Sequence, residues 1–86
     1  MPGFVGSVPD LCVEIVSPSN RRGDIAEKVA DYLGGGARMV WVIDPQRRTG
    51  EVHRQGSEPV RLGSSDMLEG YGVVPGFRTP LSALFE

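Results

Sequence analysis

The sequence has few of the residues that stabilise many small domains or bind transition metals. Its 86 residues include one cysteine, Cys12, and one histidine, His53. A single cysteine excludes an internal disulfide and a CxxC metal site, so we expect Cys12 to be a small core residue in a reducing compartment. No apolar run approaches the roughly 20 residues of a membrane span, and no basic segment followed by an apolar one opens the chain. These absences predict a soluble cytoplasmic protein with no membrane partner.

Lysine is equally scarce, because Lys28 is the only one and the other eight cationic residues are arginines. The net charge is −2, so the chain lacks the strong positive charge typical of nucleic-acid-binding domains. The pairs Arg21-Arg22 and Arg47-Arg48 have guanidinium groups that suit phosphate oxygens. Adjacent arginines are nevertheless more often part of a solvated loop. Charge alone therefore does not decide whether the protein binds a nucleic acid.

The length predicts one small domain covering residues 1–86. An apolar strand is expected at residues 11–16, then a helix that begins at 20 or 24 and ends near 33, capped either by Asn20 or by Asp24 with Glu27. Three glycines at 34–36 end the helix, and an unbroken apolar run at 39–43 predicts a second buried strand. Strand, helix and strand in this order form a βαβ unit with parallel strands and a right-handed crossover.

The remainder of the chain predicts antiparallel additions to this unit. Residues 51–54 alternate as a strand that pairs with the one before it, and a short strand is expected at 60–62. Residues 73–77 suggest an extended piece and a turn, while 79–85 predicts a short terminal helix with Pro80 at its first position. Leu81, Leu84 and Phe85 are expected to pack onto the sheet. The fold class is therefore α/β with a mixed sheet.

Glu14 is a carboxylate within the apolar strand at 11–16. Its neighbours on one face, Cys12 and Val16, are as apolar as the residues on the other, so both faces are expected to be buried. An ionised carboxylate that is buried without a partner costs several kcal/mol, so Glu14 requires a cation, a metal or hydrogen-bond donors. Ligands also gather at the carboxyl ends of parallel strands, where Glu14 is expected to lie.

Lys28 allows two interpretations. In the first, it pairs with Asp24 one turn earlier on the helix surface, which contributes only about 0.3 to 0.5 kcal/mol. Alternatively, Lys28 reaches over the sheet to Glu14, where its ammonium group could position a water molecule or a phosphate oxygen. The pattern alone does not choose between these two positions.

Several segments in order resemble one protein family. They are Pro9-Asp10-Leu11, the run 13–19 (VEIVSPS), the helix with Asp24, Lys28 and Tyr32, the glycine turn, the run 40–45 (VWVIDP) and the run 74–77 (VPGF). Together they closely resemble the C-terminal half of the Uma2 family, the DUF820 group of restriction-endonuclease-like proteins. The resemblance implies the PD-(D/E)XK nuclease fold. In that fold acidic residues on adjacent strands bind Mg²⁺ or Mn²⁺, and a lysine assists the attacking water in phosphodiester hydrolysis.

The resemblance assigns roles to Glu14, Lys28 and Asp10. Glu14 matches the metal-binding acid of the central strand, whereas the lysine expected two residues later is Val16. A lysine displaced onto the following helix is the family's usual substitute, and Lys28 occupies that place. Asp10 is a second candidate ligand, but a straight strand separates its Cα from that of Glu14 by roughly 13 Å. The two carboxylates can share one ion, with oxygens at about 2.0 to 2.1 Å, only if the chain bends at Pro9-Asp10.

Family members have an additional N-terminal half that carries another metal-binding acid. We therefore expect an N-terminally truncated core with an exposed sheet edge, which favours assembly as a homodimer. Two functions remain open. One is a metal-dependent nuclease that acts on a nucleic acid, DNA rather than RNA; the other is a catalytically silent binding or dimerisation module that keeps the same core.

The remaining polar residues point less clearly to a site. His53 is expected on the surface, since no second metal ligand is spaced near it. Asp44, which precedes a proline, is expected to form a turn at the strand end. Trp41 is expected in the core, and Ser17 has no nearby histidine to activate it as a nucleophile.

Overall fold

The computed structural model describes residues 9–86, which form six strands and two helices. In chain order these are β1 (Leu11–Ile15), α1 (Arg22–Gly34), β2 (Met39–Asp44), β3 (Thr49–Arg54), β4 (Val60–Leu62), β5 (Met67–Glu69), β6 (Arg78–Pro80) and the 3-10 helix η1 (Leu81–Phe85). Strands β1 to β4 form one mixed sheet in sequence order, and β5 pairs with β6 in a second, two-stranded sheet.

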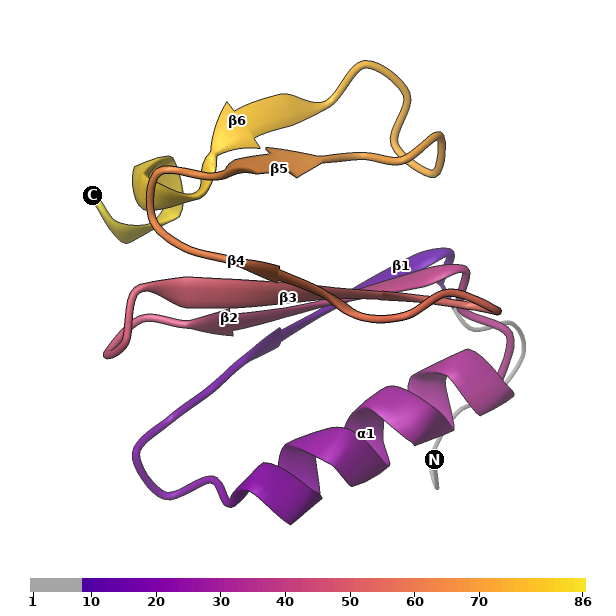
Figure 1. Cartoon of the computed structure of the whole chain (residues 1–86). Coiled ribbons are helices and arrows are strands. Elements are labelled where there is room, and N and C mark those ends of the chain that lie inside the picture. Colours follow the sequence, from indigo (N-terminus) through magenta and orange to yellow (C-terminus); the bar gives the residue numbers. More distant parts are fainter. Residues whose placement is uncertain (1–8) are drawn as a thin grey trace.

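The four-stranded sheet confirms the predicted topology. β1 pairs with β2 in parallel, and β2–β3 and β3–β4 are antiparallel. Helix α1 provides the crossover of the βαβ unit and covers one face of the sheet, whereas β5, β6 and η1 lie over the other face (Figure 1). The molecule therefore has three layers, with the sheet in the middle.

The N-terminal end of α1 is fixed differently from either predicted cap. Arg21 precedes the helix, and its backbone N–H donates to Asp24 Oδ2 at 3.2 Å, so the first-turn carboxylate satisfies an unpaired amide. Asn20 does not cap the helix, because its Oδ1 accepts the backbone N–H of Ser17 at 2.8 Å and closes the preceding turn. At the other end Gly36 has φ +113°, a conformation that favours glycine and stops the helix as predicted.

The alternation of side chains along β2 divides the core into two clusters. Met39, Trp41 and Ile43 face β5, β6 and η1, while Val40 and Val42 face α1. The first cluster is completed by Val52, Leu62, Leu68 and Leu81, and the second by Cys12, Val29 and Ala37. The predictions that Cys12 and Trp41 are core residues are confirmed, with exposed fractions of 8% and 7%.

One face of β1 is more open than predicted. Val13 and Ile15 are 49% and 57% exposed, so the expectation that both faces are buried is wrong for this face. Among residues 9–86, β1 is an edge strand with a neighbour on one side only. The layer of β5, β6 and η1 packs chiefly on β2, β3 and β4, and this leaves the outer face of β1 uncovered.

The C-terminal third also differs from the prediction. The small sheet of β5 and β6 was not predicted. Residues 73–77 contain the predicted turn but not the extended piece, since the N–H groups of Val73 and Val74 both donate to Gly70 O. The terminal helix is a 3-10 helix with Pro80 just before it. Leu81 is fully buried as predicted, but Leu84 is 44% exposed, because so short a helix turns only part of its surface to the core. Within residues 9–86 no helix is both long and apolar enough to cross a membrane.

Candidate functional site

Glu14 lies on the face of β1 that is turned toward α1. It shares this face with the buried Cys12, since residues two apart in a strand point the same way, and it pairs in register with Val42 of β2. The Glu14 side chain is only 12% exposed. The predicted demand for a partner is therefore real, because most of the side chain has been removed from water.

Lys28 meets that demand from the middle of α1. Its Nζ donates to Glu14 Oε1 at 3.2 Å, and the lysine side chain is still 43% exposed. Of the two positions allowed by the sequence, the structure therefore supports the one in which Lys28 reaches the sheet. The result is an ion pair with one nearly buried partner and one that remains open to solvent.

Two further groups with ionisable protons lie near this pair. Burial raises the pKa of the Cys12 thiol above its ordinary value of 9.0, and the negative charge of Glu14 raises it further. Burial, followed by the charges of Glu14 and Cys12, likewise raises the pKa of Tyr32 above 10.0, against a smaller opposing effect of Lys28. Both side chains are therefore neutral at pH 7, and Glu14 supplies the negative charge of the cluster.

Asp10 lies just before β1 and is exposed. The chain bends at this residue, and its carbonyl oxygen accepts the N–H groups of Arg38 and Met39 at 2.9 and 3.0 Å. These bonds fix the backbone of Asp10 to the start of β2. Across residues 9–86 the structure contains no group of three His, Cys, Asp or Glu side chains that could hold a metal ion.

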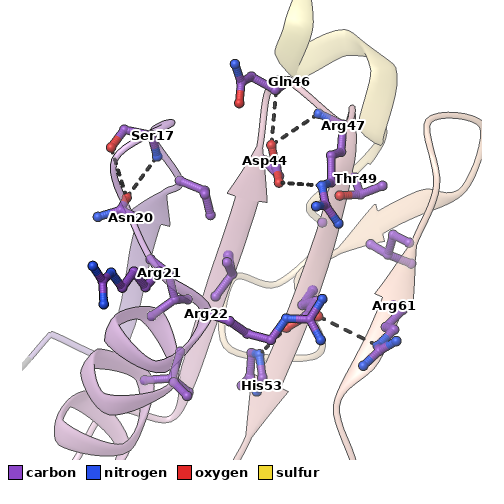
Figure 2. A pocket seen from close by; sticks show the side chains of 18 of the residues that line it. Ser17, Asn20, Arg21, Arg22, Asp44, Gln46, Arg47, Thr49, His53 and Arg61 are labelled. Atoms are coloured by element: carbon purple, nitrogen blue, oxygen red, sulfur yellow. Dashed lines mark hydrogen bonds and ion pairs between the residues drawn. The ribbon is translucent and has the colours of Figure 1, made fainter.

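A separate cavity of about 620 Å³ lies between the N-terminal half of α1 and strands β2 to β4. Figure 2 shows its polar side chains, which come from the turn before α1, the β2–β3 turn and the helix-facing side of the sheet. Its charged lining residues are Arg21, Arg22, Asp44, Arg47, Glu51 and Arg61, with His53 beside them. Glu14 and Lys28 do not line it.

The group of side chains around Glu51 was not predicted. Glu51 Oε1 lies 2.9 Å from His53 Nε2, and Glu51 Oε2 lies 3.7 Å from Arg61 Nε. The His53 side chain is 18% exposed and contacts the carboxylate of Glu51. The expectation that His53 is an ordinary surface residue is therefore wrong. The i, i+2 spacing of Glu51 and His53 was the available signal, because it places both on one face of a strand.

The turn after β2 is formed as predicted. Asp44 Oδ1 accepts the backbone N–H groups of Gln46 and Arg47, both at 3.1 Å, so this carboxylate is used in the turn. Ser17 donates its hydroxyl to Asn20 Oδ1 at 3.1 Å and stabilises the loop before α1. Neither residue is in a position that suggests nucleophilic catalysis.

Comparison with known proteins agrees with this architecture. A family model described as "Uma2: Putative restriction endonuclease" matches residues 2–82. A crystal structure of a "putative nuclease belonging to DUF820" from Anabaena variabilis ATCC 29413 superposes with a TM-score of 0.81 at 24% sequence identity. The match covers 92% of this chain and 45% of that one, so the present chain spans less than half the length of its structural relative. None of the curated proteins compared with it matches. The family match over nearly the whole sequence, together with the shared fold, shows that this chain belongs to the Uma2 family.

Proposed function

We propose that this domain, residues 1–86, supplies part of the active centre of a metal-dependent nuclease that cleaves the phosphodiester bonds of DNA. The observation that carries the proposal is the 3.2 Å contact between Lys28 Nζ and Glu14 Oε1. The carboxylate comes from a strand and the lysine from the helix that follows it. A carboxylate can bind a divalent cation, and a lysine ammonium group can orient a water molecule. The membership of the Uma2 family supports this interpretation of the pair.

The carboxylates of this chain are compatible with Mg²⁺, or with Mn²⁺ in its place. They would supply part of the ligand set and not all of it. Mg²⁺ is commonly bound through one or two carboxylates, several waters and substrate phosphates. Glu14 offers one such carboxylate, and Asp10, at the bend just before β1, is the candidate for the second. A carboxylate from a second copy of the chain is the other candidate source.

Each residue of the proposed centre has a distinct role. Glu14 would hold the metal, which would stabilise charge on the phosphate and lower the pKa of a bound water. Lys28, with its exposed ammonium group, holds the attacking water or a phosphate oxygen. Cys12 and Tyr32 remain neutral beside the pair, because burial and the charge of Glu14 raise the pKa of each.

Metal binding tests this proposal directly. Isothermal titration of Mn²⁺ into the 86-residue chain should give heat that is lost in Glu14→Gln and kept in Glu69→Gln, which changes an exposed carboxylate on β5. Cleavage of supercoiled plasmid in the presence of Mn²⁺ should be lost in both Glu14→Gln and Lys28→Met. Titration of the unchanged protein without any heat of metal binding would remove the metal-dependent function of this chain.

A second candidate function is a catalytically silent module that binds another copy of itself. Its support is the edge of β1, which is unpaired on one side within residues 9–86, and whose apolar Val13 and Ile15 are about half exposed. Sedimentation should then show a dimer that Ile15→Lys converts to a monomer, because a charge on an edge strand opposes pairing. A monomer at all concentrations would eliminate this candidate.

A further inference from the structure

We propose that the cavity beside α1 binds the phosphate groups of a nucleic-acid strand through Arg22 and Arg61. The inference rests on the proposed nuclease function for the class of ligand, but it concerns residues outside the Glu14–Lys28 pair. It gives the protein a second contact with its substrate, one that positions the strand without taking part in the chemistry.

The charge of the cavity is opposite to that of the molecule. Its lining contains four arginines and two carboxylates, which leaves it at +2 with His53 neutral, whereas the whole chain carries −2. The cationic lining residues are Arg21, Arg22, Arg47 and Arg61. Half of the eight arginines are therefore gathered around one hollow, and an anion is attracted there despite the negative net charge.

The arginines enter the cavity from different walls. Arg22 comes from the first turn of α1 and extends toward the strands, Arg61 comes from β4, and Arg21 points away from Arg61 (Figure 2). Two guanidinium groups that approach a hollow from a helix and from a strand can contact the same strand of phosphates. Arginine suits this role because its planar fork binds phosphate oxygens in pairs.

The existing partners of these arginines do not hold them firmly. The Arg61 side chain is 85% exposed and its Nε is 3.7 Å from Glu51, a surface pair of the kind that contributes little. Glu51 already contacts His53 at 2.9 Å, so it keeps a partner if Arg61 turns to a phosphate. Among residues 9–86, Arg22 forms no ion pair, and its charge is available to a ligand.

The other side of α1 provides the contrast. A shallower hollow of about 380 Å³ there is lined by Asn20, Asp24, Glu27, Lys28 and Asp31, with three carboxylates against one lysine. Phosphates are repelled from this side unless a metal ion compensates the carboxylates. The larger cavity has a volume within the roughly 300 to 1,000 Å³ of typical ligand sites. It can therefore bind a phosphate strand without a metal ion.

Fluorescence anisotropy of a labelled DNA oligonucleotide, titrated with the full chain in EDTA, tests the proposal without metal or cleavage. Arg22→Gln/Arg61→Gln should weaken binding at least tenfold and lower the slope of log K against log salt by about two. Arg78→Gln is the matched control, because Arg78 is 65% exposed on β6, in the layer across the sheet, and also forms a surface pair, 3.9 Å from Glu69. Its affinity should stay within twofold of the unchanged protein.

Equal weakening by the double variant and by Arg78→Gln would overturn the proposal, since the contact would then be diffuse. The absence of oligonucleotide binding by the unchanged protein would overturn it too, even if inorganic phosphate bound through these arginines. The outcome is separate from that of the metal titration. If the arginine variant loses DNA binding but the unchanged protein gives no heat with Mn²⁺, the cavity is supported and the metal centre is rejected. If Mn²⁺ gives heat but the arginine variant binds DNA normally, only the cavity is rejected.

Discussion

The two faces of the four-stranded sheet are built for different purposes. The face toward β5, β6 and η1 is largely apolar, although Arg54 of β3 lies on it over the ring of Tyr71, and its buried residues pack into one cluster around Trp41. The face toward α1 has a smaller apolar cluster near the crossover, and its remaining positions bear Glu14, Glu51, His53 and Arg61. One helix covers only part of this face. The comparison indicates that stability comes chiefly from one side of the sheet, which leaves the other side free to hold charge.

The largest effect is expected from Leu81→Ala on the apolar face. Leu81 is fully buried, and a β-carbon at Gly50 would stand 3.2 Å from its Cδ1, so Leu81 fills the space that this glycine leaves above β3. The substitution creates a cavity and should lower the free energy of unfolding by about 2 to 5 kcal/mol. Urea denaturation followed by Trp41 fluorescence measures the change.

Leu84→Ala is the matched control, because Leu84 belongs to the same 3-10 helix but is 44% exposed. It should lower the free energy of unfolding by less than about 1 kcal/mol, since little apolar area leaves the core. Similar losses for Leu81→Ala and Leu84→Ala would contradict the assignment of stability to the buried cluster.

A smaller effect is expected when the ion pair on the opposite face is broken. Lys28→Met leaves Glu14, whose side chain is 12% exposed, without its cation, and should lower the free energy of unfolding by about 1 to 2 kcal/mol. Glu14→Gln/Lys28→Met removes both charges and should recover most of this loss. A double variant that is as unstable as the sum of the two single variants would show that the pair has no coupling energy.

The difference between the faces also explains what the sequence could reveal. The βαβ unit, its glycine stop and the antiparallel strands after it were predictable, because unbroken apolar runs and helical periodicity are local signals. Glu14 stood out as a charge among apolar neighbours. Its pairing with Lys28 was one of two alternatives, because a lysine at the edge of the helical stripe can reach either Asp24 or the sheet. The open face of β1 was not predictable, since Val13 and Ile15 look the same whether or not another layer covers them.

The cavity and the β5–β6 sheet were missed for a related reason. Arg22, Glu51 and Arg61 belong to three elements, and only the register of β3 with β4 sets Glu51 opposite Arg61. Such a group has no spacing in the sequence that predicts it. Strands β5 and β6 have three residues each, too few for an alternating pattern to stand out from a loop.

The smallest effect is expected from alkaline pH, and it is confined to the inner cluster around Glu14. The pKa values of the buried Cys12 and of Tyr32 are raised in the folded protein by burial, with the charge of Glu14 as the next cause. Both groups ionise more readily when the chain unfolds. The stability that they contribute is therefore complete below about pH 9 and is lost as the pH rises through their raised pKa values.

Urea denaturation between pH 7.5 and 10.5 should show this decline in the unchanged protein and a shallower one in Cys12→Ala. Glu14→Gln should also flatten it, because the charge that opposes a thiolate is gone; a steeper decline in that variant would mean that Glu14 does not act on the thiol.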